Sequence, residues 1–238
     1  MLYYFRTTVA NSDNKMEEIM RLKFGFTLVE VLITQGVIGV VSAITLPTVV
    51  KNYQKHVIEN RLKKSYAIIN QALNMAVAEN GDIINWEFPQ SNAIDENYKF
   101  VQTYILPYLN VIKDCKGGKS CWADKEYLMN GNLDNTIRNA SCIMKFVLLD
   151  GSSVALYFSS DTVGHLYLDV NGKSKPNTRG KDIFEFVVVK NFVDGSYIKP
   201  KGYNSSKSVI ISNCQNNGFT CAKILMDNGW KFPKDYPW

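Results

Sequence analysis

One acidic side chain stands in a long stretch of the chain that carries no other charge. Glu30 follows Phe26-Thr27-Leu28-Val29, and the next charged residue is Lys51. A carboxylate at the centre of a membrane-spanning helix costs about 2.5–3.5 kcal/mol on insertion scales. A buried carboxylate is tolerated when an opposite charge meets it. The pattern therefore indicates that the carboxylate of Glu30 has a specific role.

A second group of oxygen-bearing side chains lies late in the chain. Asp169, Asn171, Asn177 and Asp182 fall within one short polar stretch. Hard cations such as Ca²⁺ bind carboxylate and carbonyl oxygens from a tight loop. The acidic spacing and closing glutamate of an EF-hand are absent, however, and several basic residues share the stretch. Asn and Asp also cap turns through the backbone, and we favour that interpretation over a calcium site. No other cofactor is expected.

Five cysteines follow the uncharged stretch: Cys115, Cys121, Cys142, Cys214 and Cys221. In an oxidising compartment we expect disulfides. The short separations favour the local pairs Cys115–Cys121 and Cys214–Cys221, which leaves Cys142 buried and reduced in a strand. Spacing does not fix connectivity, so exchanged pairs stay open. The separations are not those of zinc ligands.

The sequence offers little for catalysis. His56 and His165 are the only histidines, and neither lies in a recognisable motif with a nucleophile or an acid. Phosphate-binding loops and nucleotide fingerprints are absent. The net charge is +5, but the basic residues are scattered, so nucleic acid is not expected as a partner. We therefore expect a protein that is not an enzyme.

A long helix must position Glu30, the first of the candidate residues. The uncharged stretch is long enough to cross a bilayer, and beyond it apolar residues recur at helical spacing. We expect one helix from about 27 to 79, ending at Asn80-Gly81, with a kink or local melting at Pro47. Its amphipathic half carries an apolar stripe made of Ile58, Leu62, Tyr66, Ile69, Leu73 and Ala76.

The rest of the chain, 81–238, predicts one globular domain with an antiparallel sheet. Asp150-Gly151 between two β-rich runs is a hairpin signal. The expected strands are 142–149, 153–158, 165–170 and 183–189, and the expected short helices are 98–109 and 221–228. A sheet of about four strands laid on the helix stripe gives an α+β fold.

The segment Gly25-Phe26-Thr27-Leu28-Val29-Glu30-Val31-Leu32-Ile33, followed by Gly39 and Pro47, resembles the processing and methylation segment of type IV pilins and type II secretion pseudopilins. The resemblance implies cleavage between Gly25 and Phe26 by a prepilin peptidase and methylation of Phe26. It also implies that Glu30 meets the N-terminus of a neighbouring subunit. Gln35-Gly36 departs from the apolar residues usual there.

This resemblance implies four parts: a leader (1–25), a membrane-spanning part (26–50), an amphipathic part (51–80) and a pilin-like periplasmic or extracellular domain (81–238). The start codon could be Met1, Met16 or Met20. Further implications are residence in a bacterial inner membrane with a cytoplasmic N-terminus, then polymerisation with identical or related subunits by an assembly platform with an ATPase. The filament would be a pseudopilus or a surface pilus. The alternative is a membrane-anchored binding domain, for DNA or for surface adhesion, that never polymerises.

Overall fold

The computed structural model describes residues 27–90, 93–158, 163–193 and 195–238. Gly25 and Phe26 therefore lie outside the described residues. The chain divides into two units, residues 1–51 and 52–238, and each unit is described by itself.

The described part of the first unit is the beginning of helix α2, Leu28–Asn80. Its apolar side chains are exposed, including Leu28 at 79% and Ile44 at 72%. By length and composition this helix can cross a membrane. The helix continues through Pro47, so the prediction of local melting there is wrong, and the alternative of a kink stays a prediction. Pro47 lacks an N–H, which removes one backbone hydrogen bond, and the other hydrogen bonds of the helix keep it continuous.

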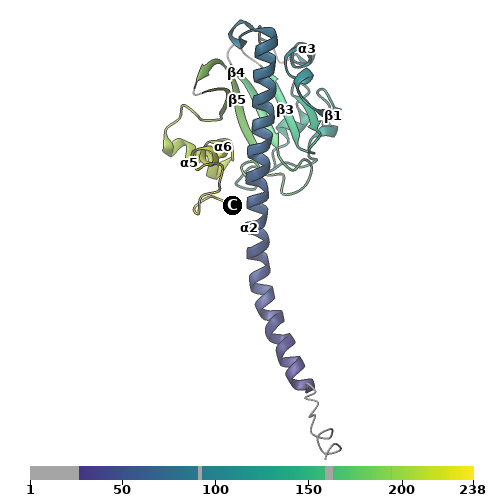
Figure 1. Ribbon diagram of the computed structural model, residues 1–238, viewed down its shortest axis with the longest axis vertical. Coiled ribbons are helices and arrows are strands. Elements are labelled where there is room, and N and C mark those ends of the chain that lie inside the picture. The colour runs from purple at the N-terminus through teal and green to yellow at the C-terminus, as the bar shows by residue number, and fades with distance from the viewer. Residues whose placement is uncertain (1–26, 91–92, 159–162, 194) are drawn as a thin grey trace, which may run out of the picture. The chain divides into compact units, whose positions relative to one another are not determined.

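In the second unit, the remainder of α2 packs its apolar stripe against the sheet, as predicted. Ile58, Leu62, Ile69, Leu73 and Ala76 are all buried. They join one core with side chains of the central strands. Figure 1 shows α2 crossing in front of β3, β4 and β5.

Tyr66, the remaining member of the stripe, is half-buried and ties the helix to the sheet. Its ring centroid lies 5.4 Å from that of Phe186, and its hydroxyl donates to the Ile198 carbonyl at 3.0 Å. The helix ends at Asn80, and Gly81 takes φ +80°, which suits a residue without a Cβ.

The sheet has six strands in sequential order, and every neighbouring pair is antiparallel. The strands are β1 Val111–Asp114, β2 Met144–Leu148, β3 Ser153–Phe158, β4 Val163–Asp169, β5 Ile183–Val193 and β6 Ser196–Pro200. The predicted α+β class is confirmed, but the prediction of four strands is wrong. The two edge strands were not predicted, because they are short. β1 is mostly exposed, and β6 ends in a proline and so lacks a clear strand pattern.

Shorter helices surround the sheet: η1 Ile83–Asn85, α3 Ile94–Tyr104, η2 Leu106–Tyr108, η3 Lys119–Cys121, α4 Thr136–Asn139, α5 Lys207–Asn216 and α6 Cys221–Asp227. The helix predicted at 98–109 begins earlier and ends at Tyr104, because Pro107 cannot continue an α-helix. Helix α5 was missed since its Ser, Asn and Gln residues give a weak apolar pattern.

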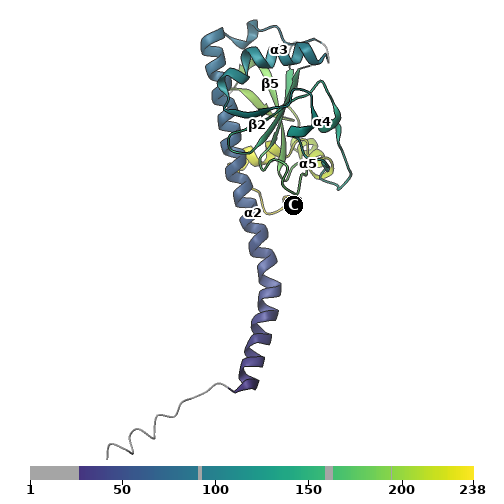
Figure 2. The ribbon, with the colours of Figure 1, turned by 90° about the vertical axis from the view of Figure 1, so that its right-hand side faces the viewer.

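Both faces of the sheet are covered. Along β3, Val154 and Leu156 join the core shared with α2. Ala155, between them, belongs to a smaller cluster with Trp122 and Ile137 on the opposite face. Alternating side chains of one strand point to opposite faces, so this strand fills both clusters. Figure 2 shows α2 and α4 on opposite sides of the sheet.

Candidate functional site

The N-terminal candidate site is a hydrogen-bonded turn at the start of α2. The Thr27 amide and the Thr27 hydroxyl each donate to Glu30 Oε2 at 2.9 Å. In return the Glu30 amide donates to Thr27 Oγ1 at 3.2 Å. This is a capping box, in which Thr and Glu three residues apart satisfy each other's amides. Glu30 thus has a local partner. This capping box was not predicted, although the Thr-x-x-Glu spacing indicates it.

Beyond this turn, the helix presents an apolar surface with two small positions. A Cβ added at Gly36 or at Gly39 would meet nothing within 4 Å. Small residues let helices approach closely in a membrane. This surface can therefore face lipid or another apolar helix.

The cysteines form two disulfides. Cys115 bonds to Cys121 with Cα atoms 5.9 Å apart, and Cys214 bonds to Cys221 with Cα atoms 4.7 Å apart. These are the local pairs that the spacing favoured. Cys142 is free and half-buried, and it precedes β2. We predicted Cys142 to be a buried residue of a strand, which is wrong because β2 begins only at Met144.

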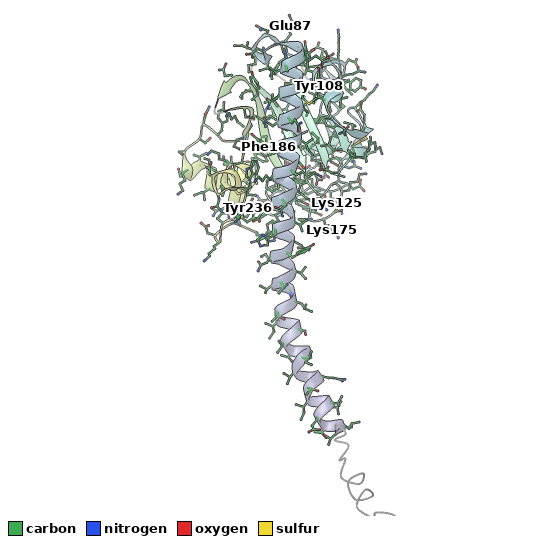
Figure 3. The ribbon with its side chains drawn as sticks, in the orientation of Figure 1. Glu87, Tyr108, Lys125, Lys175, Phe186 and Tyr236 are labelled. Atoms are coloured by element: carbon green, nitrogen blue, oxygen red, sulfur yellow. A yellow bond between two sulfur atoms is a disulfide. The ribbon has the colours of Figure 1, made fainter. Side chains whose placement is uncertain are left out.

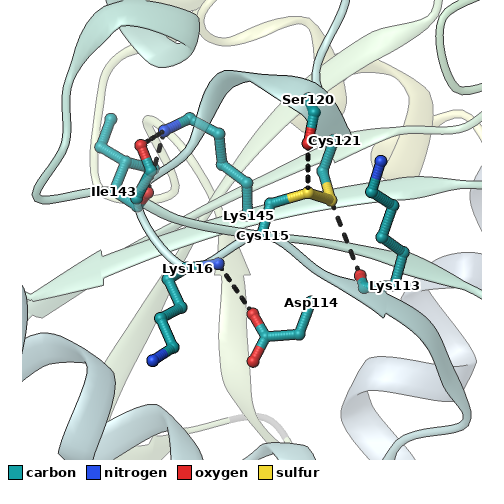
Figure 4. Close-up of a disulfide and its surroundings, with 9 residues drawn as sticks. Lys113, Asp114, Cys115, Lys116, Ser120, Cys121, Ile143 and Lys145 are labelled. Atoms are coloured by element: carbon teal, nitrogen blue, oxygen red, sulfur yellow. Dashed lines mark hydrogen bonds between the residues drawn. A yellow bond between two sulfur atoms is a disulfide. The ribbon is translucent and has the colours of Figure 1, made fainter.

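A buried lysine lies near the first disulfide (Figure 4). The Lys145 amine donates to the carbonyls of Ala140 at 2.8 Å and of Ile143 at 3.0 Å. Burial lowers the pKa of Lys145 to about 8. Three carbonyls surround the amine, including that of Gly117 at 3.3 Å. Lys145 therefore holds the 116–143 segment onto the sheet, and no pattern in the sequence predicts this role.

The β4–β5 loop, residues 170–182, holds the oxygen-rich group. Asp182 is fully buried, and its carboxylate accepts from the amides of Asn177 and Thr178, both at 2.7 Å. This is the turn capping that we favoured. Burial raises the pKa of Asp182 to about 6, although those two amides oppose the shift.

The other members of the group are not capped in this way. Asp169 is fully buried. Within the part of the chain that the structure describes, neither of its carboxylate oxygens makes a hydrogen bond of ordinary geometry. Burial, and then the neighbouring Asp182 carboxylate, raises the pKa of Asp169 well above its usual value, although nearby amides of Asn171 and Gly172 oppose this. Asn171 Oδ1 and Asn177 Oδ1 are also buried without a partner among the described residues. Four side-chain oxygens of this group are therefore buried and unsatisfied among the described residues.

The two histidines have structural surroundings. The His56 side chain is 72% exposed and lies 2.9 Å from Glu59. His165 lies 3.3 Å from Glu185, and its ring stacks on Tyr157 at a centroid distance of 4.8 Å. Each histidine thus lies beside a glutamate carboxylate, and neither of these two contacts includes a nucleophile.

One buried ion pair crosses from the 122–135 segment to the β4–β5 loop. Arg179 Nε lies 2.5 Å from Glu126 Oε1, and Arg179 Nη2 lies 3.0 Å from Asp134 Oδ2. Trp122 Nε1 donates to the other Glu126 oxygen at 2.9 Å. Burial works against the Arg179 charge, but Glu126 and Asp134 outweigh it, so the pKa of Arg179 is raised. This pair anchors the loop.

Taken together, these features define an α+β protein with a six-stranded antiparallel sheet packed on an N-terminal helix that is long and apolar enough to span a membrane. A family model, the family of unknown function (DUF6613), matches residues 48–238, and the chain belongs to this family. The match covers the sheet domain and begins after the Gly25–Pro47 segment. No curated protein and no solved structure matches the chain.

Proposed function

We propose that this protein is a prepilin-like structural subunit, which a prepilin peptidase cleaves and methylates and which then polymerises into a pseudopilus or pilus. The observation that carries the proposal is the order of residues around Gly25, Phe26 and Glu30 at the start of an exposed apolar helix. The second half of the same helix packs on an antiparallel sheet, the arrangement that the resemblance to pilins implies.

The proposal gives each part of the N-terminal segment a mechanical role. Cleavage after Gly25 would create an ammonium at Phe26, four residues before Glu30. In a filament, this cation on one subunit would pair with the Glu30 carboxylate of the next, away from water. Such pairing sets the register between subunits, because an unpaired buried charge is costly. The energy for extraction from the membrane would come from a partner ATPase.

A second candidate is a membrane-anchored extracytoplasmic binding domain that does not polymerise. The capping box favours this alternative, since two hydrogen bonds from Thr27 account for Glu30 Oε2 without a second subunit. The two functions make opposite predictions about processing and assembly.

Replacing Gly25 with leucine tests the processing step. We expect Gly25→Leu to stay uncut in cells that contain a prepilin peptidase, because a bulky side chain would fill the position next to the scissile bond. The measurement is the size of the membrane-bound chain on an immunoblot. Gly36→Leu is the matched control and should be cut like the unsubstituted protein. Normal cleavage of Gly25→Leu would contradict the assignment of the leader.

A further inference from the structure

The end of the chain, residues 230–238, is rich in aromatic side chains, and we call it the C-terminal tail. Trp230, Phe232, Tyr236 and Trp238 are four of its nine residues. Tyr236 is buried in the main core, and the other three pack against that core while they stay partly exposed. The tail therefore presents aromatic surface that core packing does not fully cover.

The tail is tied to helix α2. The Phe232 amide donates to Glu59 Oε1 at 2.7 Å. The Lys55 ammonium lies over the rings of Phe232 and Trp238, at 5.9 and 5.3 Å from their centroids. These two rings also contact each other, with centroids 4.7 Å apart. The tail is therefore held against the turns of α2 that contain Lys55 and Glu59.

These turns follow closely on the uncharged stretch of the sequence. Asn52, the first residue of the second unit, comes directly after Lys51, at which that stretch ends. An α-helix rises about 1.5 Å per residue, so Glu59 is only about 10 Å from Asn52 along α2. If the uncharged stretch crosses a bilayer, the chain connection alone keeps the tail near the lipid headgroups.

The residues in and beside the tail have the composition of a membrane interface. Trp and Tyr are enriched at such interfaces, because their rings are apolar and their N–H or O–H groups are polar. Tyr53 is 69% exposed, and Trp238 is partly exposed. Lys231 and Lys234 are exposed, against one exposed acid of the tail, Asp235. Aromatic rings and an excess of positive charge therefore occur together here.

A cavity of about 540 Å³ lies beside Trp238, between α2 and the β4–β5 loop. Its lining includes Tyr53 and three cationic side chains, those of Arg61, Lys175 and Lys181. The described residues that line this cavity include no acid. The cavity therefore suits an anionic group of small size.

The acids of the neighbouring loop do not change this balance. Asp169 and Asp182 are fully buried, and neither lines the cavity. Figure 3 shows Lys175 with Tyr236 of the tail at the end of the domain opposite to Glu87. The cations and the aromatic tail therefore belong to one end of the domain.

We propose that the C-terminal tail and this cavity form an interfacial site that binds the headgroup of an anionic phospholipid. Arg61, Lys175 and Lys181 supply positive charge for the phosphate, and Tyr53 and Trp238 supply the interfacial rings. Basic residues close to a membrane surface attract anionic lipid within about a Debye length. The inference rests on the membrane anchoring in the proposed function, and it applies to the polymerising and the non-polymerising candidate alike.

The test follows the tryptophan fluorescence of the full chain in lipid nanodiscs. The discs contain phosphatidylcholine with a headgroup spin label, which quenches nearby tryptophan, either with or without phosphatidylglycerol. We expect stronger quenching with phosphatidylglycerol, and Trp238→Phe should remove at least half of the quenching. Trp86→Phe, a change at a buried tryptophan, is the matched control and should keep it. Equal quenching in the two variants, or quenching that is independent of phosphatidylglycerol, would overturn the proposal.

Charge variants locate the headgroup. Arg61→Gln/Lys175→Gln should remove at least half of the extra quenching that phosphatidylglycerol causes. Lys99→Gln/Lys113→Gln removes the same charge at exposed positions that do not line the cavity, and it should keep the full effect. An undiminished effect of phosphatidylglycerol in the first variant, or an equal loss in both, would overturn the proposal.

The same preparation separates this inference from the membrane anchoring on which it rests. A chain that co-elutes with the discs but shows no quenching of Trp238 contradicts the headgroup site alone. A chain that does not co-elute with the discs contradicts the anchoring, and the headgroup site with it.

Discussion

Replacing Glu30 with glutamine should abolish filament assembly while membrane insertion and cleavage continue. Glutamine can take the place of glutamate in a capping box, so the hydrogen bonds with Thr27 are kept and only the charge is lost. If the charge of Glu30 pairs with the N-terminus of a neighbouring subunit, a neutral side chain leaves that ammonium buried and unpaired. A loss of this kind costs about 3–5 kcal/mol per contact, which is large when repeated along a filament.

The measurement is the yield of sheared or crosslinked filaments relative to membrane-bound subunit. Glu30→Leu should behave like Glu30→Gln. Gln35→Leu, which removes a polar group from the same helix but no charge, is the matched control and should assemble. Thr27→Val separates the two roles of Glu30, because it disrupts the cap and keeps the charge. If Glu30→Gln forms filaments and Thr27→Val does not, the capping role of Glu30 is favoured. That result would contradict the pairing of Glu30 with the N-terminus of a neighbouring subunit.

The largest effect on stability is expected at the buried ion pair. Glu126→Met should lower the free energy of unfolding by about 3–5 kcal/mol, because it leaves the Arg179 guanidinium buried with a weaker set of partners. The Glu126 side chain is 0% exposed and that of Arg179 is 6% exposed, so water cannot replace the lost carboxylate. Urea denaturation of the full chain in detergent measures the change.

Two further variants check that the cause is the unpaired charge. The double variant Glu126→Met/Arg179→Met should recover much of the loss, because apolar side chains of similar size can replace a buried pair. Asp124→Asn, at an exposed acid that pairs with Arg138, should change stability by less than about 1 kcal/mol. A Glu126→Met protein as stable as the unsubstituted chain would show that the pair contributes nothing net.

The periodicity of apolar residues and the turn residues were sufficient to predict the long helix and the central hairpin of this fold. The stripe from Ile58 to Ala76, the stop at Asn80-Gly81 and the Asp150-Gly151 hairpin are local patterns, and the structure has each of them. The edge strands β1 and β6 were not predicted, because β1 is short and mostly exposed and β6 is short and ends in a proline, so neither carries a clear strand pattern.

The β4–β5 loop illustrates what a sequence pattern cannot predict, namely which buried side chains find a hydrogen-bond partner. Asp169 and Asp182 are the same residue type only thirteen positions apart. Two backbone amides donate hydrogen bonds of ordinary geometry to Asp182, whereas no described group donates one to Asp169. This difference depends on how residues 170–182 fold back on the sheet. The ion pair of Glu126 with Arg179 joins residues 53 positions apart, and no local pattern predicts it. By contrast, the Thr27–Glu30 capping box was readable from spacing alone.

The mass of the N-terminal peptide of the protein purified from its native membrane tests the central proposal most directly. Prepilin processing predicts a peptide that begins at N-methylated Phe26, with Glu30 as its fifth residue. Such a peptide would leave the type of filament as the next question. A peptide that begins at Met1, Met16 or Met20 would contradict the proposal and favour a membrane-anchored domain that does not polymerise.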